Sequence, residues 1–177
     1  MSARLAVIVA STREGRFGPT VANWFVDRAR QVEGVDVDVI DLVDVTFPGE
    51  EFTSRIGAAE AFVVVTPEYN HSFPGPLKVA LDSVRGEWFA KPVGFVSYGG
   101  MSGGLRSVEA LRLVFAELHA MTVRETVSFA MAWSQFDQDG RPTDPEPCNA
   151  AAAALLRQLL WWTSALSEAR VARPYPS

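Results

Sequence analysis

Cysteine and histidine are scarce in this sequence. Among its 177 residues there is one cysteine, Cys148, and there are two histidines, His71 and His119. A single cysteine can form no disulfide within the chain and supplies no thiolate cluster, so we expect Cys148 to be inert and the protein to be cytoplasmic. The histidines are far apart in the sequence and neither has ligand-type spacing around it, which predicts no metal site.

Positive charge and long apolar stretches are also limited. The chain has 16 Lys and Arg against 21 Asp and Glu, a net charge of -5, whereas binding along nucleic acid requires a basic stripe. We therefore expect no nucleic acid partner. The most apolar long stretch, residues 150–166, contains Arg157 and Gln158 and is short for a bilayer span. We expect no membrane partner, and no export leader before the first apolar run.

The sequence alternates regularly between strand-like and helix-like segments. Residues 5–10, 61–66 and 93–98 are mostly apolar, which is typical of strands buried on both faces of a parallel sheet. Residues 35–39 and 122–131 carry charged residues among their valines, which indicates edge strands. Helical spacing of apolar residues predicts helices at residues 19–32, 52–59, 75–84, 105–118 and 148–167.

This alternation predicts one α/β domain over residues 1–177. With the second and fifth strands as edges, the arrangement that fits is a flavodoxin-like three-layer sandwich around a five-stranded parallel sheet of order 2-1-3-4-5. A ligand of such a sheet lies at the carboxyl ends of strands 1 and 3. The loops after strands 1, 3 and 4 share that edge, so we treat them as one candidate site.

The first loop reads STREGRFGPT, from Ser11 to Thr20. It combines hydroxyl groups, two arginines and two glycines directly before a helix, which indicates a phosphate cradle. It lacks the Lys-Ser/Thr ending of a P-loop and the G-x-G-x-x-G of a dinucleotide fold, which argues against a nucleoside triphosphate or Rossmann-bound NAD. A solvated basic turn is the alternative for this loop taken alone. The candidate residues are Ser11, Thr12, Arg13, Gly15, Arg16, Gly18 and Thr20.

The second loop reads PEYNHSFPGPLK and follows strand 3 directly. Three prolines stiffen it, Tyr69 and Phe73 supply flat apolar surface, and polar side chains lie between them. A planar heterocycle needs that combination. His71 could donate a proton, but it has no assignable carboxylate partner, so a binding or packing role is favoured. The polar candidates are Glu68, Asn70, His71 and Ser72.

The third loop, SYGGMSGGLRS, has four glycines within six positions. They allow either close approach of a ligand or a sharp strand-to-helix turn. Gly100, Ser102 and Gly104 also match the nucleophile elbow G-x-S-x-G of serine hydrolases. That fold needs an acid and then a histidine later in the chain, and only His119 follows, near the end of the next helix. A hydrolase using Ser102 is therefore a remote alternative.

Two of these loops resemble the motifs of a known family. The first is similar to G-S-x-R-x-G-S, and PEYNHSFPGPLKVALD is similar to P-E-Y-N-x-S-x-P-G-x-L-K-N-A-I-D, both from the NADPH-dependent FMN reductases of flavodoxin-like fold, which include quinone, azo and chromate reductases. The resemblance extends to about Ala130. Ala10 stands where the family usually has glycine, and Val79 where it usually has asparagine.

The resemblance implies a set of FMN contacts. It places the phosphate and ribityl chain on Ser11, Arg13, Arg16, Phe17, Gly18 and Thr20. It places the isoalloxazine ring on Pro67, Glu68, Tyr69 and Asn70, with its pyrimidine edge at Ser97, Tyr98, Gly99 and Gly100. From the same loops we add Thr12, His71 and Gly103 as cofactor-binding candidates.

The resemblance also implies an activity. NADPH or NADH would reduce FMN, which would pass electrons to a quinone, a flavin or another small-molecule acceptor; the flavin carries the chemistry, so no catalytic side chain is expected. A non-enzymatic FMN-binding electron carrier or redox-responsive module is the alternative. The family implies a homodimer or homotetramer, with Trp88 and Phe89 as candidates for the interface or, equally, the core. Residues 133–141 are a candidate cap.

Overall fold

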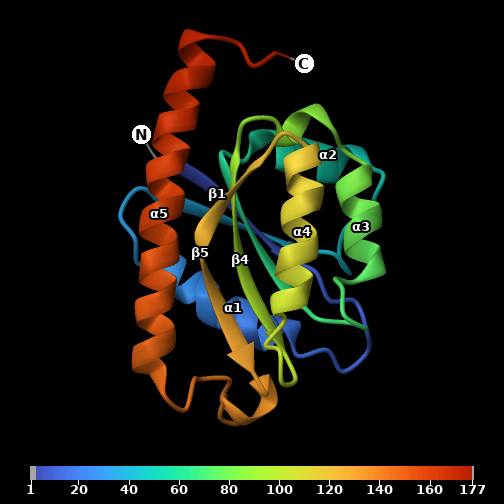
Figure 1. Cartoon of the computed structure of the whole chain (residues 1–177), viewed down its shortest axis with the longest axis vertical. Helices are drawn as coiled ribbons and strands as arrows, with labels where there is room; N and C mark the ends of the chain where they lie inside the picture. The colour runs from blue at the N-terminus through green and yellow to red at the C-terminus, as the bar shows by residue number, and fades with distance from the viewer. Residues whose placement is uncertain (1–2, 177) are drawn as a thin grey trace.

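The structure, a computed structural model, describes residues 3–176 and is built on one parallel sheet. The sheet has five strands in the order β2-β1-β3-β4-β5 (Figure 1), which confirms the predicted flavodoxin-like order. The strands are β1 (Ala3–Val9), β2 (Val35–Asp41), β3 (Ala61–Pro67), β4 (Pro92–Gly99) and β5 (Met121–Ala130).

Each of the five predicted helices is present. They are α1 (Gly18–Ala29), α2 (Glu50–Ala58), α3 (Gly75–Asp82), α4 (Leu105–Glu117) and α5 (Pro145–Ala172), with short 3-10 helices η1 (Gly86–Trp88) and η2 (Ala132–Ser134). The helix α5 begins three residues before the predicted start and ends five residues after the predicted end. Pro145 suits the first helical position, because its missing N–H has no partner to lose there. Within residues 3–176, no helix combines the length and apolar character of a bilayer span.

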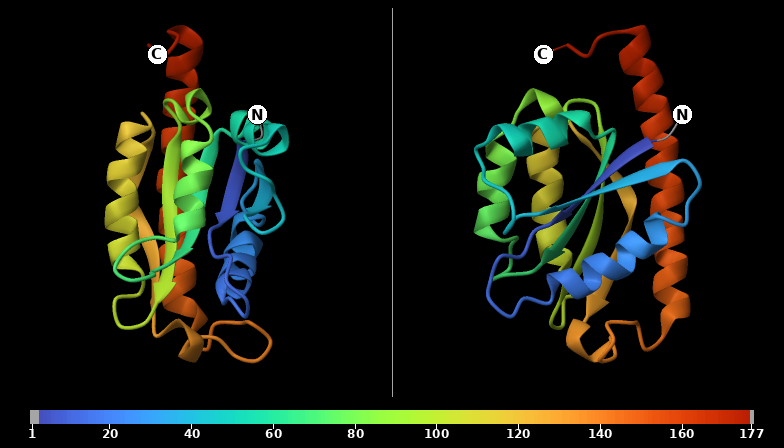
Figure 2. Two further views of the ribbon diagram at one scale, coloured as in Figure 1. Left: turned by 90° about the vertical axis from the view of Figure 1, so that its right-hand side faces the viewer. Right: turned by 180° about the vertical axis from the view of Figure 1, so that it is seen from behind.

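Two apolar cores lie on the two faces of the sheet. Helices α1 and α5 cover one face, with Phe25 and Leu155 fully buried against the sheet, and they lie next to each other in the right-hand view of Figure 2. Helices α2, α3 and α4 cover the other face, which buries Phe52, Leu77 and Phe115. This three-layer arrangement explains why β1, β3 and β4 are apolar on both faces.

Trp88 belongs to the second core. It is fully buried, with its ring 4.7 Å from that of Phe62 and 5.6 Å from that of Phe115, between centroids. Of the two roles the sequence allowed, the structure therefore gives Trp88 the core role. Phe89 instead stacks on His119 at 4.7 Å between ring centroids.

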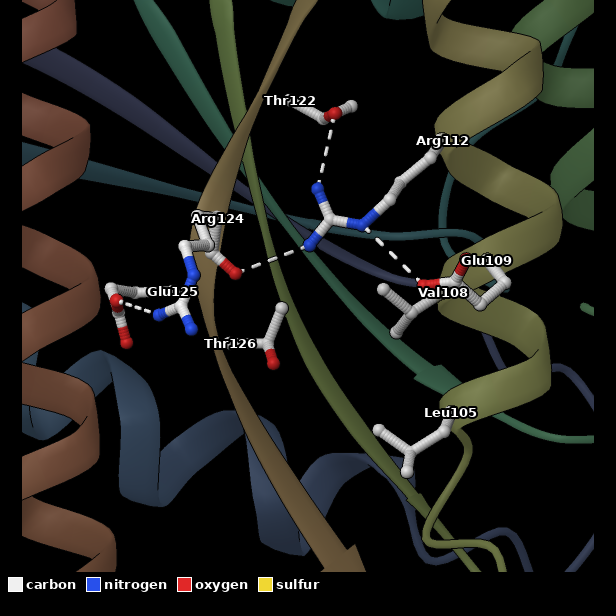
Figure 3. A pocket seen from close by; sticks show the side chains of 8 residues that line it. All are labelled: Leu105, Val108, Glu109, Arg112, Thr122, Arg124, Glu125 and Thr126. Atoms are coloured by element: carbon white, nitrogen blue, oxygen red, sulfur yellow. Dashed lines mark hydrogen bonds and ion pairs between the residues drawn. The ribbon is translucent and has the colours of Figure 1, made fainter.

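The outer edge of β5 is occupied by side chains from the helices on either side. Arg112 of α4 donates hydrogen bonds to the carbonyls of Val123 (2.8 Å) and Arg124 (3.3 Å), and Gln158 of α5 accepts one from the amide of Glu125 (2.8 Å). A groove of about 590 Å³ lies between α4 and this edge (Figure 3). Groups that bond the free edge of a strand oppose its pairing with another chain.

The carboxyl ends of all five strands point the same way, toward the lower end of Figure 1, and the C-terminus lies at the opposite end. We call this lower end the carboxyl rim. The first, second and third rim loops are residues 10–18, 67–74 and 99–104.

Candidate functional site

The three rim loops contact one another through side chains. The central guanidinium carbon of Arg13 lies 3.6 Å from the centroid of the Tyr69 ring, which joins the first loop to the second. The Glu68 amide donates to the Tyr98 carbonyl (3.2 Å), and the Ser102 hydroxyl donates to the Glu68 carboxylate (2.6 Å), which joins the second loop to the third. The structure thus brings the sequence-predicted loops together at one place.

The first rim loop presents free backbone donors. In the part of the chain that the structure describes, the amides of residues 12–15 donate no hydrogen bond to another group. They stand just before the N-terminus of α1, where the helix dipole favours negative charge. Gly15 has φ +66°, and nothing lies within 4 Å of the position a side chain would take there. Successive free amides in a loop with a left-handed residue form an anion-binding concavity.

The two arginines of this loop have different environments. Arg16 donates to both oxygens of Asp41, at 2.7 and 2.8 Å, and to the Ser11 carbonyl at 2.9 Å. The hydrogen bonds to Asp41 raise the pKa of Arg16 against the opposing effect of burial. Arg16 therefore ties the loop to the end of β2, whereas exposed Arg13 is the arginine that can turn toward an anion. Sequence reasoning missed Asp41, which lies two residues beyond the predicted strand at residues 35–39 and is the last residue of β2 in the structure.

Two buried hydroxyls lie where this loop meets β4. Ser11 Oγ and the Tyr98 hydroxyl lie near each other, but neither makes a hydrogen bond of normal geometry with any group among residues 3–176. Burial raises the pKa of Tyr98, so its hydroxyl is neutral at physiological pH. A Cβ atom on Gly18 would lie 2.1 Å from Ser11 Oγ and 2.8 Å from the Tyr98 hydroxyl, so only glycine fits there. Buried unpaired polar atoms are costly and are a feature of functional sites.

The second rim loop is a tight turn. Tyr69 and Ser72 exchange backbone hydrogen bonds of 2.8 and 3.1 Å, and Asn70 (φ 51°) and His71 (φ 69°) are both left-handed between them. Two left-handed central residues define a type I′ turn, in which histidine is strained and asparagine is common. The Ser107 hydroxyl lies 2.8 Å from the Pro67 carbonyl and 2.7 Å from that of Ser72, so its single proton can bond either carbonyl and anchors the second rim loop to α4.

The Glu68 side chain ties the second rim loop to the third and to α4. Its nearly buried carboxylate accepts from the Ser102 hydroxyl and from the Arg106 side chain (2.8 Å) and amide (3.2 Å). Burial opposes ionisation, but the hydrogen bonds from Ser102 and Arg106 outweigh it and lower the pKa of Glu68. The carboxylate thus stays ionised and fixes the second loop to the start of α4.

The backbone of the third rim loop requires glycine at two of its four glycine positions. Gly103 and Gly104 have φ +63° and +84°, and a Cβ on Gly104 would lie 2.8 Å from the Ser97 Cβ. The Gly103 carbonyl accepts from the hydroxyls of Ser97 (2.8 Å) and Ser128 (2.9 Å). These bonds account for Ser97 and Gly103 as parts of a sharp turn. The case for ligand contact in this loop depends on Gly99 and Gly100.

The nucleophile-elbow pattern does not assemble a triad. Ser102 is bonded to Glu68, while His119 follows the far end of α4, a helix of 13 residues that spans roughly 20 Å. There, Nδ1 of His119 lies 3.2 Å from the hydroxyl of Tyr175. Ser102 and His119 are therefore too far apart to act as nucleophile and base.

A fourth segment, residues 131–143, also reaches the rim. The Phe136 ring lies 5.5 Å from that of Phe17 in an edge-to-face arrangement, measured between centroids. The Met131 amide donates to the Gly100 carbonyl (2.9 Å). This segment, which contains the candidate cap at residues 133–141, contacts both the first and the third rim loop.

Comparison with known proteins agrees with this geometry. A family model for NADPH-dependent FMN reductase matches residues 3–134. The chain belongs to this family. It is 37% identical over 120 residues to an NAD(P)H-dependent FMN reductase of Schizosaccharomyces pombe, covering 57% of this chain and 60% of that protein. It is 32% identical over 175 residues to the NAD(P)H:quinone oxidoreductase of Solanum tuberosum, covering 86% and 89%.

The fold of this FMN reductase family member also matches solved structures. An oxidoreductase from Corynebacterium diphtheriae superposes with a TM-score of 0.71 at 21% identity, covering 92% of this chain and 97% of that one. The two departures from the family motifs cause no conflict. Ala10 is buried and its amide continues the sheet by donating to the Val65 carbonyl (2.9 Å), and Val79 lies exposed on α3.

Proposed function

We propose that this protein is an FMN-dependent NAD(P)H oxidoreductase that passes electrons to a quinone, a flavin or another small acceptor. The observation that carries the proposal is the row of unpartnered amides at residues 12–15, beside Arg13 and at the N-terminus of α1. Together they offer an anion site at the same rim as the Tyr69 ring. Family membership supports the choice of FMN.

The residues at the rim suit the two ends of this cofactor. The amides of residues 12–15, the Thr12 hydroxyl and Arg13 would hold the phosphate, and Thr20 lies in the first turn of α1. Ser11 and Tyr98 supply buried hydroxyls that lack partners within the described chain. The flat ring would be held between the Tyr69 turn and the backbone of the third rim loop. The ties through Arg16 and Glu68 position these groups before binding.

When bound, FMN would accept a hydride from the nicotinamide and deliver two electrons to the acceptor. With a quinone, the overall reaction is NAD(P)H + H⁺ + quinone → NAD(P)⁺ + hydroquinone. The protein's part is to orient the partners. The proton reaches the product oxygen from solvent at this exposed rim, so no acid-base pair is required of the side chains.

The names of several relatives, such as the NAD(P)H:quinone oxidoreductase of Solanum tuberosum, support a quinone as the acceptor. We further propose, from the family resemblance, a cytoplasmic homodimer or homotetramer, formed by one domain spanning residues 1–177 and having no nucleic acid partner. Trp88 is fully buried in the core and is therefore not available for a subunit contact.

Stopped-flow mixing of the FMN-loaded protein with NADPH, and separately with NADH, tests the proposal. Rapid bleaching of the flavin absorbance band, followed by recovery on addition of 1,4-naphthoquinone, is the expected result. A protein that binds FMN but is bleached by neither nucleotide would instead be an electron carrier or redox-responsive module. A protein that does not bind FMN would refute the assignment altogether.

A further inference from the structure

Three large exposed apolar side chains belong to two segments that contact each other at the carboxyl rim. Met101 follows Gly100 in the third rim loop and is 93% exposed, while Met131 (46%) and Trp133 (60%) follow β5. Exposed apolar groups gathered at one place on a soluble protein mark an interaction site more often than isolated ones do.

Specific hydrogen bonds fix the backbone around Met131. Met131 has φ 49°, which is uncommon for a residue other than glycine. Its amide donates to the Gly100 carbonyl, its carbonyl accepts from the Ser134 hydroxyl (2.8 Å), and the Gln135 side chain donates to the Ala130 carbonyl. A strained residue fixed from both sides indicates a conformation that is maintained for a function.

Trp133 adjoins the part of the third rim loop that is free for a ligand. A Cβ atom on Gly100 would lie 3.8 Å from Cη2 of Trp133, so the indole ring stands directly beside the Gly100 backbone. Gly100 is one of the two glycines that the turn itself leaves unexplained. The indole N–H donates to no group within residues 3–176, so it is available to an incoming molecule.

We propose that Trp133, with Met101 and Met131, forms the contact surface for a planar aromatic electron acceptor of the quinone class. The indole offers a flat apolar face together with a hydrogen-bond donor for a quinone carbonyl, and methionines adapt to rings of different outline. The proposal rests on the proposed function, because it takes the flavin to lie at Gly99 and Gly100.

The size of the surface favours a small molecule over a second copy of the chain. Three side chains expose on the order of a few hundred Å², whereas a stable protein interface buries roughly 800 Å² on each partner. The surface also lies at the rim where the acceptor must approach. This surface should favour acceptors with a flat aromatic ring. An anionic acceptor that accepts electrons without stacking on Trp133 would not bind more tightly because of it.

Kinetics with two acceptors test this role. In the FMN-loaded protein, W133A should raise KM for 1,4-naphthoquinone roughly threefold to tenfold with little change in kcat, and W133F should restore most of the loss. The rate with ferricyanide and the bleaching by NADPH should not change. W161A, which removes an equally exposed tryptophan from α5, is the matched control and should behave as the wild type.

Equilibrium binding of 1,4-naphthoquinone to the oxidised FMN-loaded protein, measured by calorimetry, gives a readout that needs no turnover. We expect W133A to weaken it by the same factor. Unchanged binding in W133A, or a loss shared by W161A, would overturn the proposal, as would a change of oligomeric state in W133A on gel filtration. If NADPH does not bleach the wild type, the proposed function fails, and the binding experiment still decides whether Trp133 contacts the quinone.

Discussion

Alanine should be far more disruptive at Gly104 than at Gly15, although both residues have left-handed backbone, with φ +84° and +66°. The left-handed conformation costs a non-glycine residue about 1–2 kcal/mol at either position. At Gly104 the new methyl group would also lie 2.8 Å from the Ser97 Cβ and 2.9 and 3.0 Å from the backbone N and O of Tyr98. Overpacking of this kind adds about 1–3 kcal/mol. At Gly15 nothing lies within 4 Å.

Urea and thermal unfolding of both variants measure the difference. For a chain of this size, about 1 kcal/mol corresponds to roughly 2–4 °C in Tm, so Gly104→Ala should melt roughly 4–20 °C below the wild type and Gly15→Ala roughly 2–8 °C below it. Because the two ranges overlap, the prediction is that Gly104→Ala has the lower Tm of the two variants. The m-value in urea should be unchanged in both. Equal losses in the two variants would show that the backbone of β4 yields easily and that close approach does not require glycine at position 104.

The Gly15→Ala and Gly104→Ala variants also distinguish an effect on stability from an effect on FMN binding. Gly15 lies within the free amides of the first rim loop, so a shift of its backbone should weaken FMN binding while costing little stability. Fluorescence titration with FMN measures this. A Gly15→Ala variant that binds FMN as the wild type does would contradict the assignment of the phosphate to these amides.

Three further predictions follow from individual contacts. Arg13→Ala should weaken FMN binding roughly tenfold to a hundredfold in the same titration with little loss of stability, whereas Arg16→Ala, which leaves Asp41 unpaired, should lower the free energy of unfolding by about 1–3 kcal/mol in urea. Because the pKa of Glu68 is lowered in the folded state, the stability difference between wild type and Glu68→Gln should be full above about pH 5 and vanish as the pH falls through that lowered pKa. Burial lowers the pKa of Lys91 from 10.5 to about 8, so unfolding free energy should rise between about pH 8 and pH 10.5 by up to about 3 kcal/mol, and Lys91→Met should flatten that rise in pH-dependent urea titrations.

The fold could be predicted from the sequence because burial on two faces and burial on one face leave different patterns. Residues 61–65 are all apolar and Thr66 follows them, and the structure buries all six between two helix layers. In β2, Asp36 and Asp38 alternate with valines, as an edge strand allows. What the pattern could not give was the full length of α5, because its last turns, exposed at Val171, lack a continuous apolar stripe.

The site could be predicted only as a neighbourhood of loops. Parallel topology brings their ends together, but the partner of each side chain depends on distances that sequence does not encode. Arg16 and Asp41 are 25 positions apart, and Glu68 and Ser102 are 34 apart. Arg16 and Glu68 were predicted as ligand contacts and Ser102 as a remote candidate nucleophile, and each of the three is hydrogen-bonded to another side chain of the protein.

The rim therefore contains two kinds of polar residue that sequence alone treats alike. Arg16 and Glu68 have their bonding capacity used within the protein, and they fix the loops in place. The amides of residues 12–15 and the hydroxyls of Ser11 and Tyr98 are unpaired within the described chain. Because the paired residues already fix the loops in the free protein, little conformational entropy is lost when FMN binds to the unpaired groups. Substitutions of the first kind should therefore lower stability and cofactor affinity together, and those of the second kind should weaken cofactor affinity without lowering stability.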